Sequence, residues 1–246
     1  MKGIRTLLIS IIFSCLLLPA GGEPGRKLLC VTGESGPRPF FDFLSESDFS
    51  VTYVADNSPE LERRIGESDL VILACETRGT QHARIWNHER GLFQFVRSGG
   101  RLLFCAPGIG AWSMVRNAYP ALLPVTPLMD SAVAENFAKQ FRWDREWEGG
   151  RRKKVVASEH PAFSGIRDWP DFYEGAKPGS FNAYNFDRWA PKPHTDFALR
   201  TADGGLALAF MPFEKGRTGF LLATCMTTAG PPGRVGRIAS ASGGRC

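Results

Sequence analysis

The thiol of Cys105 is the strongest candidate nucleophile in this sequence, because it ends an apolar run and precedes an Ala-Pro-Gly turn. A cysteine hydrolase needs a thiolate, a histidine within about 3 Å of it, and a carboxylate that orients the histidine. His160 and His194 are the candidate bases, and Asp196 is the candidate carboxylate. The alternative is a buried structural thiol at Cys105, since free cysteine behaves as a small hydrophobe, and a surface position for His194.

A second group of residues could bind a ligand without any nucleophile. Open α/β sheets bind ligands outside the carboxyl ends of their strands. Glycines at such an edge let a ligand approach the backbone, and a tryptophan can stack on a sugar ring. Each of these residues also has an alternative as a turn glycine, a core side chain or a solvated charge. The residues predicted to line the ligand site are Glu76, Ala106, Gly108, Gly110, Trp112 and His160.

Neither a metal nor a cofactor is predicted. His82 and His88 are six residues apart and do not share a helix face. Glu159 and His160 are adjacent, so their side chains would point apart on a strand. The cysteines show no C-x-x-C spacing of the kind found in zinc or redox sites.

The elements that must position these residues follow from the apolar pattern. Strands are expected over 27–32, 49–54, 70–74, 101–105 and 154–157, and helices over 85–96 and from Ser58 and Pro59 through Ile65. The last third is rich in strands, expected over 195–200, 206–213 and 219–224, with glycine-containing turns between them.

Alternation of strand and helix in the first half predicts βαβ units and a parallel sheet. The predicted fold class is therefore α/β, a flavodoxin-like three-layer sandwich with a mainly parallel central sheet and β-hairpin additions near the C-terminus.

The two ends of the chain differ from the part between them. Lys2, Arg5, an apolar run over 7–18 and small residues at 20–22 predict a secretory signal peptide over 1–22. We expect an exported, periplasmic or extracellular protein, tethered to the membrane only if this segment stays uncleaved. A single α/β domain is expected over 23–229. Residues 230–246 carry little apolar surface and are expected to be a disordered or truncated tail.

Composition limits the class of partner. The chain is 43% hydrophobic and 22% charged, as in ordinary globular proteins. The net charge of +5 is too mild to indicate a nucleic-acid-binding protein. The dense basic run over 151–154 is expected to be a solvated loop leading into a strand. A small molecule or sugar and a protein partner remain as binding partners, and Trp143, Trp147 and Trp189 suit either partner contacts or a core.

Four short stretches resemble the class I glutamine amidotransferase-like superfamily, in branches that do not transfer amide nitrogen. The segment 159–161 (EHP) resembles the ThuA-like group, which is linked to trehalose utilisation. The segment 215–224 resembles bacterial amidotransferase-like domains without an assigned activity. The other two stretches are 69–73 (DLVIL) and 95–103 (FVRSGGRLL). In order and spacing, the four span most of 27–227.

The resemblance implies a lost nucleophile. In the superfamily the catalytic cysteine sits on the tight turn after a strand, and the stretch 99–110 places Ala106 at that position, with Cys105 one residue early. A shift of one residue on a strand turns the side chain to the opposite face. The His-x-Glu pair of the superfamily has its counterpart in His194 and Asp196. The members compared usually continue into a closing helix that contains tryptophan, which 231–246 does not resemble, so a truncated gene or a shifted reading frame is an explanation.

The residues and the resemblance together favour an exported, non-catalytic amidotransferase-like domain. It would bind a small ligand, such as a carbohydrate, or a protein partner. The sequence favours no enzyme activity, because the Cys-His-Glu triad is not intact. The alternatives are a ThuA-like sugar-processing enzyme and a cysteine hydrolase that uses Cys105.

Overall fold

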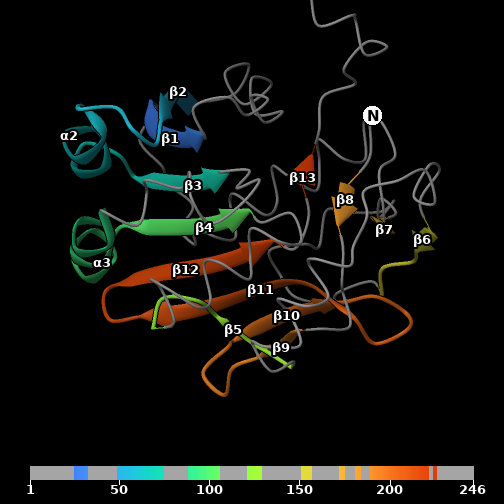
Figure 1. Ribbon diagram of the computed structural model, residues 1–246. Coiled ribbons are helices and arrows are strands. Elements are labelled where there is room, and N and C mark those ends of the chain that lie inside the picture. The colour runs from blue at the N-terminus through green and yellow to red at the C-terminus, as the bar shows by residue number, and fades with distance from the viewer. Residues whose placement is uncertain are drawn as a thin grey trace, which may run out of the picture.

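The structure is a computed structural model that describes residues 25–32, 49–74, 88–105, 121–128, 151–156, 172–174, 181–183, 189–221 and 224–225. In these residues the chain forms an α/β fold around a seven-stranded sheet (Figure 1). Its strands are β1 (Arg26–Thr32), β2 (Phe49–Ala55), β3 (Leu70–Ala74), β4 (Arg101–Cys105), β10 (Phe197–Arg200), β11 (Leu206–Phe213) and β12 (Gly216–Leu221).

The sheet is mostly parallel, in the order β10-β11-β12-β4-β3-β1-β2. The pairs β1–β2, β1–β3, β3–β4 and β4–β12 are parallel. The pairs β11–β12 and β10–β11 are antiparallel, so a hairpin extends the parallel part of the sheet. This agrees with the predicted α/β class, parallel sheet and hairpin additions.

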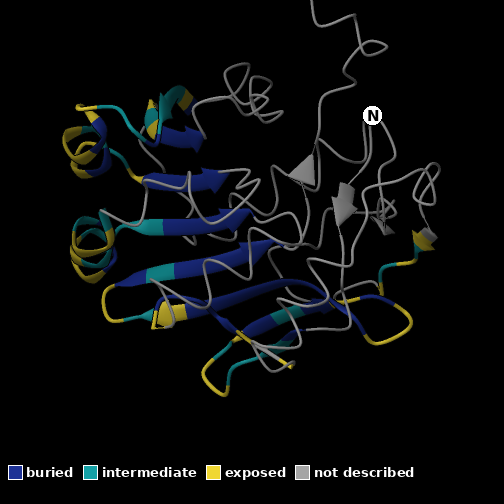
Figure 2. Ribbon diagram, viewed as in Figure 1, coloured by how far each residue is buried: buried dark blue, intermediate teal, exposed yellow. Residues whose placement is uncertain are grey.

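Two helices lie side by side near the amino ends of β3 and β4: α2 (Leu61–Gly66) and α3 (Glu89–Arg97) (Figure 1). Helix α3 also packs against β4 and β12. Each helix buries a short apolar face, made of Leu61 and Ile65 in α2 and of Leu92 and Val96 in α3. The exposed faces of both helices, yellow in Figure 2, include charged residues.

Short strands form two further sheets. A four-stranded sheet has the order β13-β8-β7-β6, and a two-stranded sheet joins β5 to β9. Their bounds are β5 (Val125–Pro127), β6 (Arg151–Lys153), β7 (Phe172–Glu174), β8 (Phe181–Ala183), β9 (Trp189–Pro191) and β13 (Thr224–Cys225).

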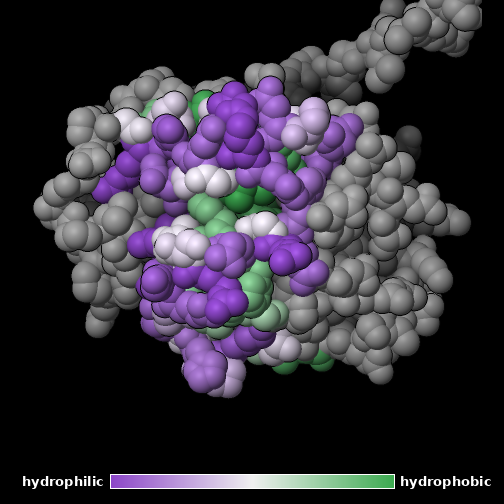
Figure 3. All heavy atoms as spheres, turned by 90° about the vertical axis from the view of Figure 1, so that its left-hand side faces the viewer, coloured by the Kyte–Doolittle hydropathy of each residue, from purple (hydrophilic) through white to green (hydrophobic). Residues whose placement is uncertain are grey.

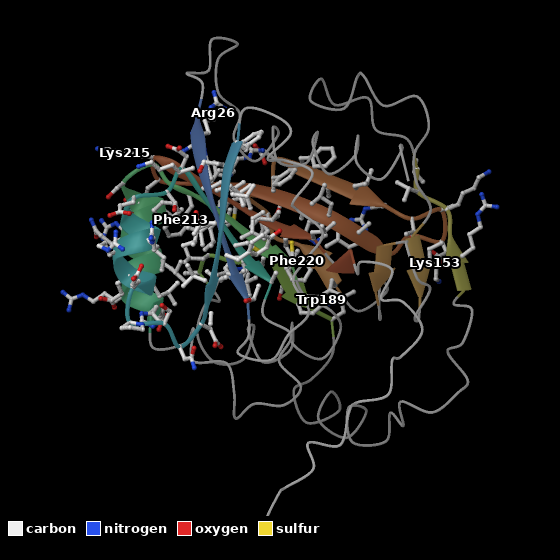
Figure 4. The ribbon with its side chains drawn as sticks, turned by 90° about the horizontal axis from the view of Figure 1, so that it is seen from above. Arg26, Lys153, Trp189, Phe213, Lys215 and Phe220 are labelled. Carbon is white, nitrogen blue, oxygen red and sulfur yellow. The ribbon has the colours of Figure 1, made fainter. Side chains whose placement is uncertain are left out.

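The core lies along the central strands of the large sheet: β3 is buried from end to end, and β1, β4 and β12 are buried except near their amino ends (Figure 2). Such continuous apolar strands are typical of parallel sheets whose two faces are covered. Trp189 of β9 joins this core, because it is 2% exposed and its ring centroid lies 5.1 Å from that of Phe220 (Figure 4). Of the two alternatives for Trp189, the structure therefore supports the core and not a partner contact.

Several element boundaries differ from the sequence-based expectation. The strand expected over 154–157 is displaced, because β6 occupies Arg151–Lys153 and only an isolated bridge joins Val155 to Thr201. The basic run is thus mostly strand and not loop. Ser58 does not cap α2 directly: the helix begins at Leu61, and the Ser58 Oγ accepts a hydrogen bond from the Glu60 N–H at 3.3 Å within the preceding turn.

Helix α3 ends just before a pair of glycines, Gly99 and Gly100. Gly99 adopts a left-handed φ of +113° and its N–H donates to the Val96 carbonyl at 3.0 Å. The helix ends at Arg97, and Arg101 opens the next strand. Among the helices of the described ranges, none is both long and apolar enough to cross a membrane.

Candidate functional site

The carboxyl edge of the parallel strands contains a point where the chain reverses its direction of travel across the sheet. From β1 the chain first adds β2 on one side, and then adds β3 on the other side. In open α/β sheets, ligands bind in the crevice outside the carboxyl ends of strands at such a switch point. Thr32 and Ala74, which end β1 and β3, are paired in register there.

Two buried polar side chains lie at this edge. Thr32 is 8% exposed and Asp56, directly after β2, is 1% exposed. The Asp56 N–H donates to the Thr32 carbonyl at 2.8 Å, so the two residues are held together. Sequence analysis missed Asp56, because a single polar residue in an Asp-Asn-Ser-Pro stretch looks like part of a solvated turn. Its place directly after a strand was the available signal.

Cys105 also belongs to this edge. It is the last residue of β4, lies opposite Leu221 of β12, is 4% exposed, and is not in a disulfide. Cys30 is a second thiol outside any disulfide, completely buried within β1. Register places Cys30 at the level of Leu103 and not of Cys105, two strands away across the sheet. The two thiols therefore cannot form a disulfide without rearranging the sheet.

His194 and Asp196 lie at the opposite edge. The Asp196 carboxylate accepts a hydrogen bond from the Arg217 guanidinium at 2.9 Å, and Arg217 is paired in register with Arg101 at the start of β4. Cys105 is four residues further along β4, roughly 13 Å at 3.3 Å per residue. The structure therefore does not bring His194 and Asp196 to Cys105.

The surroundings of His194 are those of a surface turn. His194 is exposed, and the Thr195 N–H donates to the Lys192 carbonyl at 3.0 Å. The Thr195 hydroxyl donates to the Pro124 carbonyl at 2.7 Å, which ties the turn to the residue directly before β5. Partial burial lowers the pKa of the Lys192 amine. These hydrogen bonds explain why the turn that carries His194 has its conformation, without a catalytic role for His194.

The other residues predicted for a site lie outside the part of the chain that the structure describes. Two of them follow described strands in the sequence: Glu76 is two residues after β3, and Ala106 is the residue after β4. The predicted residues outside the described ranges are Glu76, Ala106, Gly108, Gly110, Trp112 and His160.

A groove of about 650 Å³ lies at the amino edge, between α2 and α3. Ile65 and Phe95 contribute apolar surface to it, and Asp69 and Arg101 contribute charge. Figure 3 shows the resulting apolar strip between the hydrophilic surfaces of the two helices. An ion pair between His88 and Glu62, at 3.2 Å, joins α3 to α2 beside it.

The described residues contain no group of three or more His, Cys, Asp or Glu side chains arranged to hold a metal ion. The polar side chains at the carboxyl edge, Thr32 and Asp56, are hydrogen-bonding groups for a ligand with hydroxyl or amide functions.

Comparisons with known proteins bear on the fold. No protein-family profile and no curated protein matches the chain. The cytoplasmic protein STM3548 from Salmonella typhimurium has a similar structure, with a TM-score of 0.50 at 17% sequence identity over 81% of this chain and 88% of that one. This likeness shows the α/β fold alone.

Two further solved structures are less similar. PurLQS from Thermotoga maritima gives a TM-score of 0.44 at 13% identity, over 80% of this chain and 87% of that chain. The exo-beta-1,4-mannosidase Op5Man5 from Opitutaceae bacterium strain TAV5 gives 0.41 at 12% identity, over 82% of this chain and 31% of that chain. Neither similarity is high enough to support a functional argument.

Proposed function

We propose that this chain is an exported, class I glutamine amidotransferase-like domain that binds a small ligand, such as a carbohydrate, and does not catalyse a reaction. The proposal includes a flavodoxin-like three-layer arrangement, with helices on both faces of the seven-stranded sheet. The alternative ligand in this proposal is a protein partner that binds at the carboxyl edge of the sheet.

The observation that carries the proposal is the chemistry of the carboxyl edge. The sheet changes direction between β1 and β3, and a buried carboxylate and a buried hydroxyl lie beside that point. Glu76 and Ala106, which are predicted for the ligand site, follow β3 and β4 in the sequence. A site of this kind orients a ligand with a few polar groups inside an apolar surround.

Absence of catalysis is supported by the positions of the candidate triad residues. Cys105 is buried at one edge, while His194 and Asp196 lie at the other. Of the two candidate bases, His160 is the one left for a cysteine hydrolase that uses Cys105. The ThuA-like sugar-processing enzyme remains the alternative on the strength of the segment 159–161.

The test uses the purified full chain and two assays. Isothermal titration calorimetry with glucose, galactose, mannose and trehalose measures binding, and release of ammonia from glutamine measures hydrolysis. The proposal expects saturable sugar binding and no ammonia. Ammonia release that Cys105→Ala abolishes would contradict it in favour of the hydrolase, and chemical change of a bound sugar would favour the ThuA-like enzyme.

A further inference from the structure

The groove between α2 and α3, of about 650 Å³, has the size of a small-molecule site. Ile65 and Phe95 give it an apolar floor, and hydrophilic surfaces border it on both sides (Figure 3). Two lining glycines, Gly66 of α2 and Gly91 of α3, keep it open, because a Cβ atom at either position would have nothing within 4 Å. The groove lies at the amino edge, so it is a separate site from the carboxyl edge of the proposed function.

The groove carries two carboxylates that no lysine or arginine side chain neutralises within the described part of the chain. Glu62 lies 3.2 Å from a ring nitrogen of His88, which is charged only if protonated. Asp69 accepts a hydrogen bond from a backbone amide, the Lys27 N–H, at 2.8 Å. Glu60, on the same helix but outside the groove, differs from both, because it pairs with two arginine side chains at 2.9 and 3.2 Å.

Arg101 is the cation among the described residues that line the groove. It is half-buried, and its guanidinium donates a hydrogen bond to the Gly99 carbonyl. One guanidinium against two carboxylates leaves the described lining with a net negative charge. The groove therefore attracts a cationic ligand and disfavours an anionic one.

The Phe95 ring provides a second attraction for a cation. It packs against Gly100, where a Cβ atom would lie 2.5 Å from the ring, and this close packing holds the ring in place. Among the described residues, no second aromatic ring and no guanidinium or ammonium group contacts it. The face of an aromatic ring attracts cations, and its apolar surface favours burial of methylene groups.

We propose that this groove binds a linear aliphatic diamine, with one ammonium group beside Glu62, the other beside Asp69, and the methylene chain on Ile65 and Phe95. Glu62 lies in the first turn of α2 and Asp69 directly before β3. Their separation is roughly 10 Å at a helical rise of about 1.5 Å per residue. A diamine has a positive charge at each end and an apolar part between them, and its ammonium groups donate charge-assisted hydrogen bonds to carboxylates.

Isothermal titration calorimetry of the full chain in low-salt buffer tests the ligand class. The diamine probes are putrescine, hexamethylenediamine and octamethylenediamine. Butylamine, hexylamine and octylamine have the same chains with one ammonium group, and hexanediol has none. We expect saturable binding of one diamine per chain, at least about threefold tighter than the monoamine of equal length, and no binding of hexanediol. Absence of saturable binding by every diamine would overturn the inference, and so would equal affinities of diamine and monoamine.

Removal of single carboxylates tests where the ligand lies. Glu62→Gln and Asp69→Asn should each weaken the tightest diamine by about threefold to fivefold, because exposed ion pairs contribute modestly. Glu60→Gln is the matched control for loss of one negative charge from α2, and its affinity should stay within about twofold of wild type. Equal losses in Glu60→Gln and Glu62→Gln would indicate attraction to the overall charge and contradict the site. An effect of only one of the two groove substitutions would overturn the two-ended placement.

Gly91→Leu tests the groove without changing either carboxylate. The space beside Gly91 is open and leucine favours a helix, so the fold should be retained, which circular dichroism checks. The leucine side chain should block the groove and weaken diamine binding at least about tenfold. Gly91→Ala adds one methyl group and should keep the affinity within about threefold of wild type. Undiminished binding to folded Gly91→Leu would place the diamine elsewhere and overturn the inference.

Discussion

The two edges of the large sheet are built in different ways. At the amino edge, charged side chains pair with each other across neighbouring segments, as in Arg217 with Asp196 and Arg97 with Glu214, 2.9 Å apart in the second case. The Asp69 carboxylate there accepts a hydrogen bond from the Lys27 N–H at 2.8 Å. At the carboxyl edge, β1, β3, β4 and β12 end in buried residues, and Asp56, directly after β2, is a buried carboxylate.

This difference separates stability from binding. Ion pairs hold neighbouring segments together at the amino edge, so changes there should alter the free energy of unfolding. The carboxyl edge is where the ligand of the proposed function would bind, so changes there should alter the affinity for that ligand. The following measurements would break or sharpen this division.

The largest expected effect concerns the thiols at and below the carboxyl edge. Cys30 is 0% and Cys105 is 4% exposed. In the folded protein, both should react with iodoacetamide at least about 10³-fold more slowly than in urea, because labelling requires local opening. Mass spectrometry of the labelled peptides gives the two rates. Rapid labelling of Cys105 well below a pH of about 8.5 would instead indicate an activated thiolate and favour the hydrolase.

Gly216 provides the next largest effect, at the amino edge. A Cβ atom there would lie 2.1 Å from the Val96 carbonyl oxygen and 2.4 Å from that of Gly100. Both neighbours are backbone, so Gly216→Val should lower the free energy of unfolding by about 3 kcal/mol or more in urea titrations.

Gly91 is the matched control for this substitution. It lies inside α3, and a Cβ there would have nothing within 4 Å. Gly91→Ala should stabilise the protein by up to about 1 kcal/mol through helix propensity. Equal effects of the two substitutions would contradict the close approach described for Gly216.

A smaller effect is expected from Arg217. Its side chain is 11% exposed, pairs with Asp196, and lies 5.4 Å from the centroid of the Phe210 ring. Arg217→Met keeps the packed stem but loses the charge, so it should destabilise by about 1–2 kcal/mol. Asp196→Asn should cost less than about 1 kcal/mol, because that carboxylate is 41% exposed. Urea titrations of both variants show which substitution lowers the free energy of unfolding more. A larger loss of stability in Asp196→Asn than in Arg217→Met would contradict the larger role given to Arg217.

The smallest effect tests a turn at the carboxyl end of β10. Hydrogen bonds from Lys153 and Thr201 lower the pKa of the Asp203 carboxyl below its ordinary 3.8. A lowered pKa stabilises the folded state above the unfolded pKa, and this contribution disappears as the pH falls through the folded pKa. Asp203→Asn should therefore cost less than about 1 kcal/mol at pH 7. The difference from wild type should shrink below a pH of about 4, and one that persists unchanged to pH 2 would exclude this mechanism.

Buried parallel strands were the part of the fold most readily predicted from sequence. Residues 70–74 and 101–105 form strands with the predicted bounds, because an apolar run between polar turns leaves little choice of ends. Strand β12 was harder to delimit. It begins at Gly216 and not at the predicted Gly219. The charged Arg217 pairs with Asp196 and so remains part of the strand.

The candidate site was predictable in location but not in detail. A parallel sheet implies a ligand-binding carboxyl edge, and Cys105 lies there as expected. Spacing in sequence could not tell which histidine approaches Cys105. That depends on the antiparallel β10–β11 hairpin, which places Asp196 at the far edge. Asp56 was missed because its importance comes from burial, which a turn-like sequence does not reveal.

The pairing of β4 with β12 has a consequence for synthesis of the chain. Strand β4 ends at Cys105, but its parallel neighbour is made more than a hundred residues later. Until residues 216–221 emerge from the ribosome, one side of an apolar strand has no β12 to pair with. Unpaired strand edges promote aggregation, and long-range pairing is slow to form. A nascent chain stopped before Gly216 would therefore be a client for chaperones and proteases, whereas addition of β12 gives β4 its second neighbour in the large sheet.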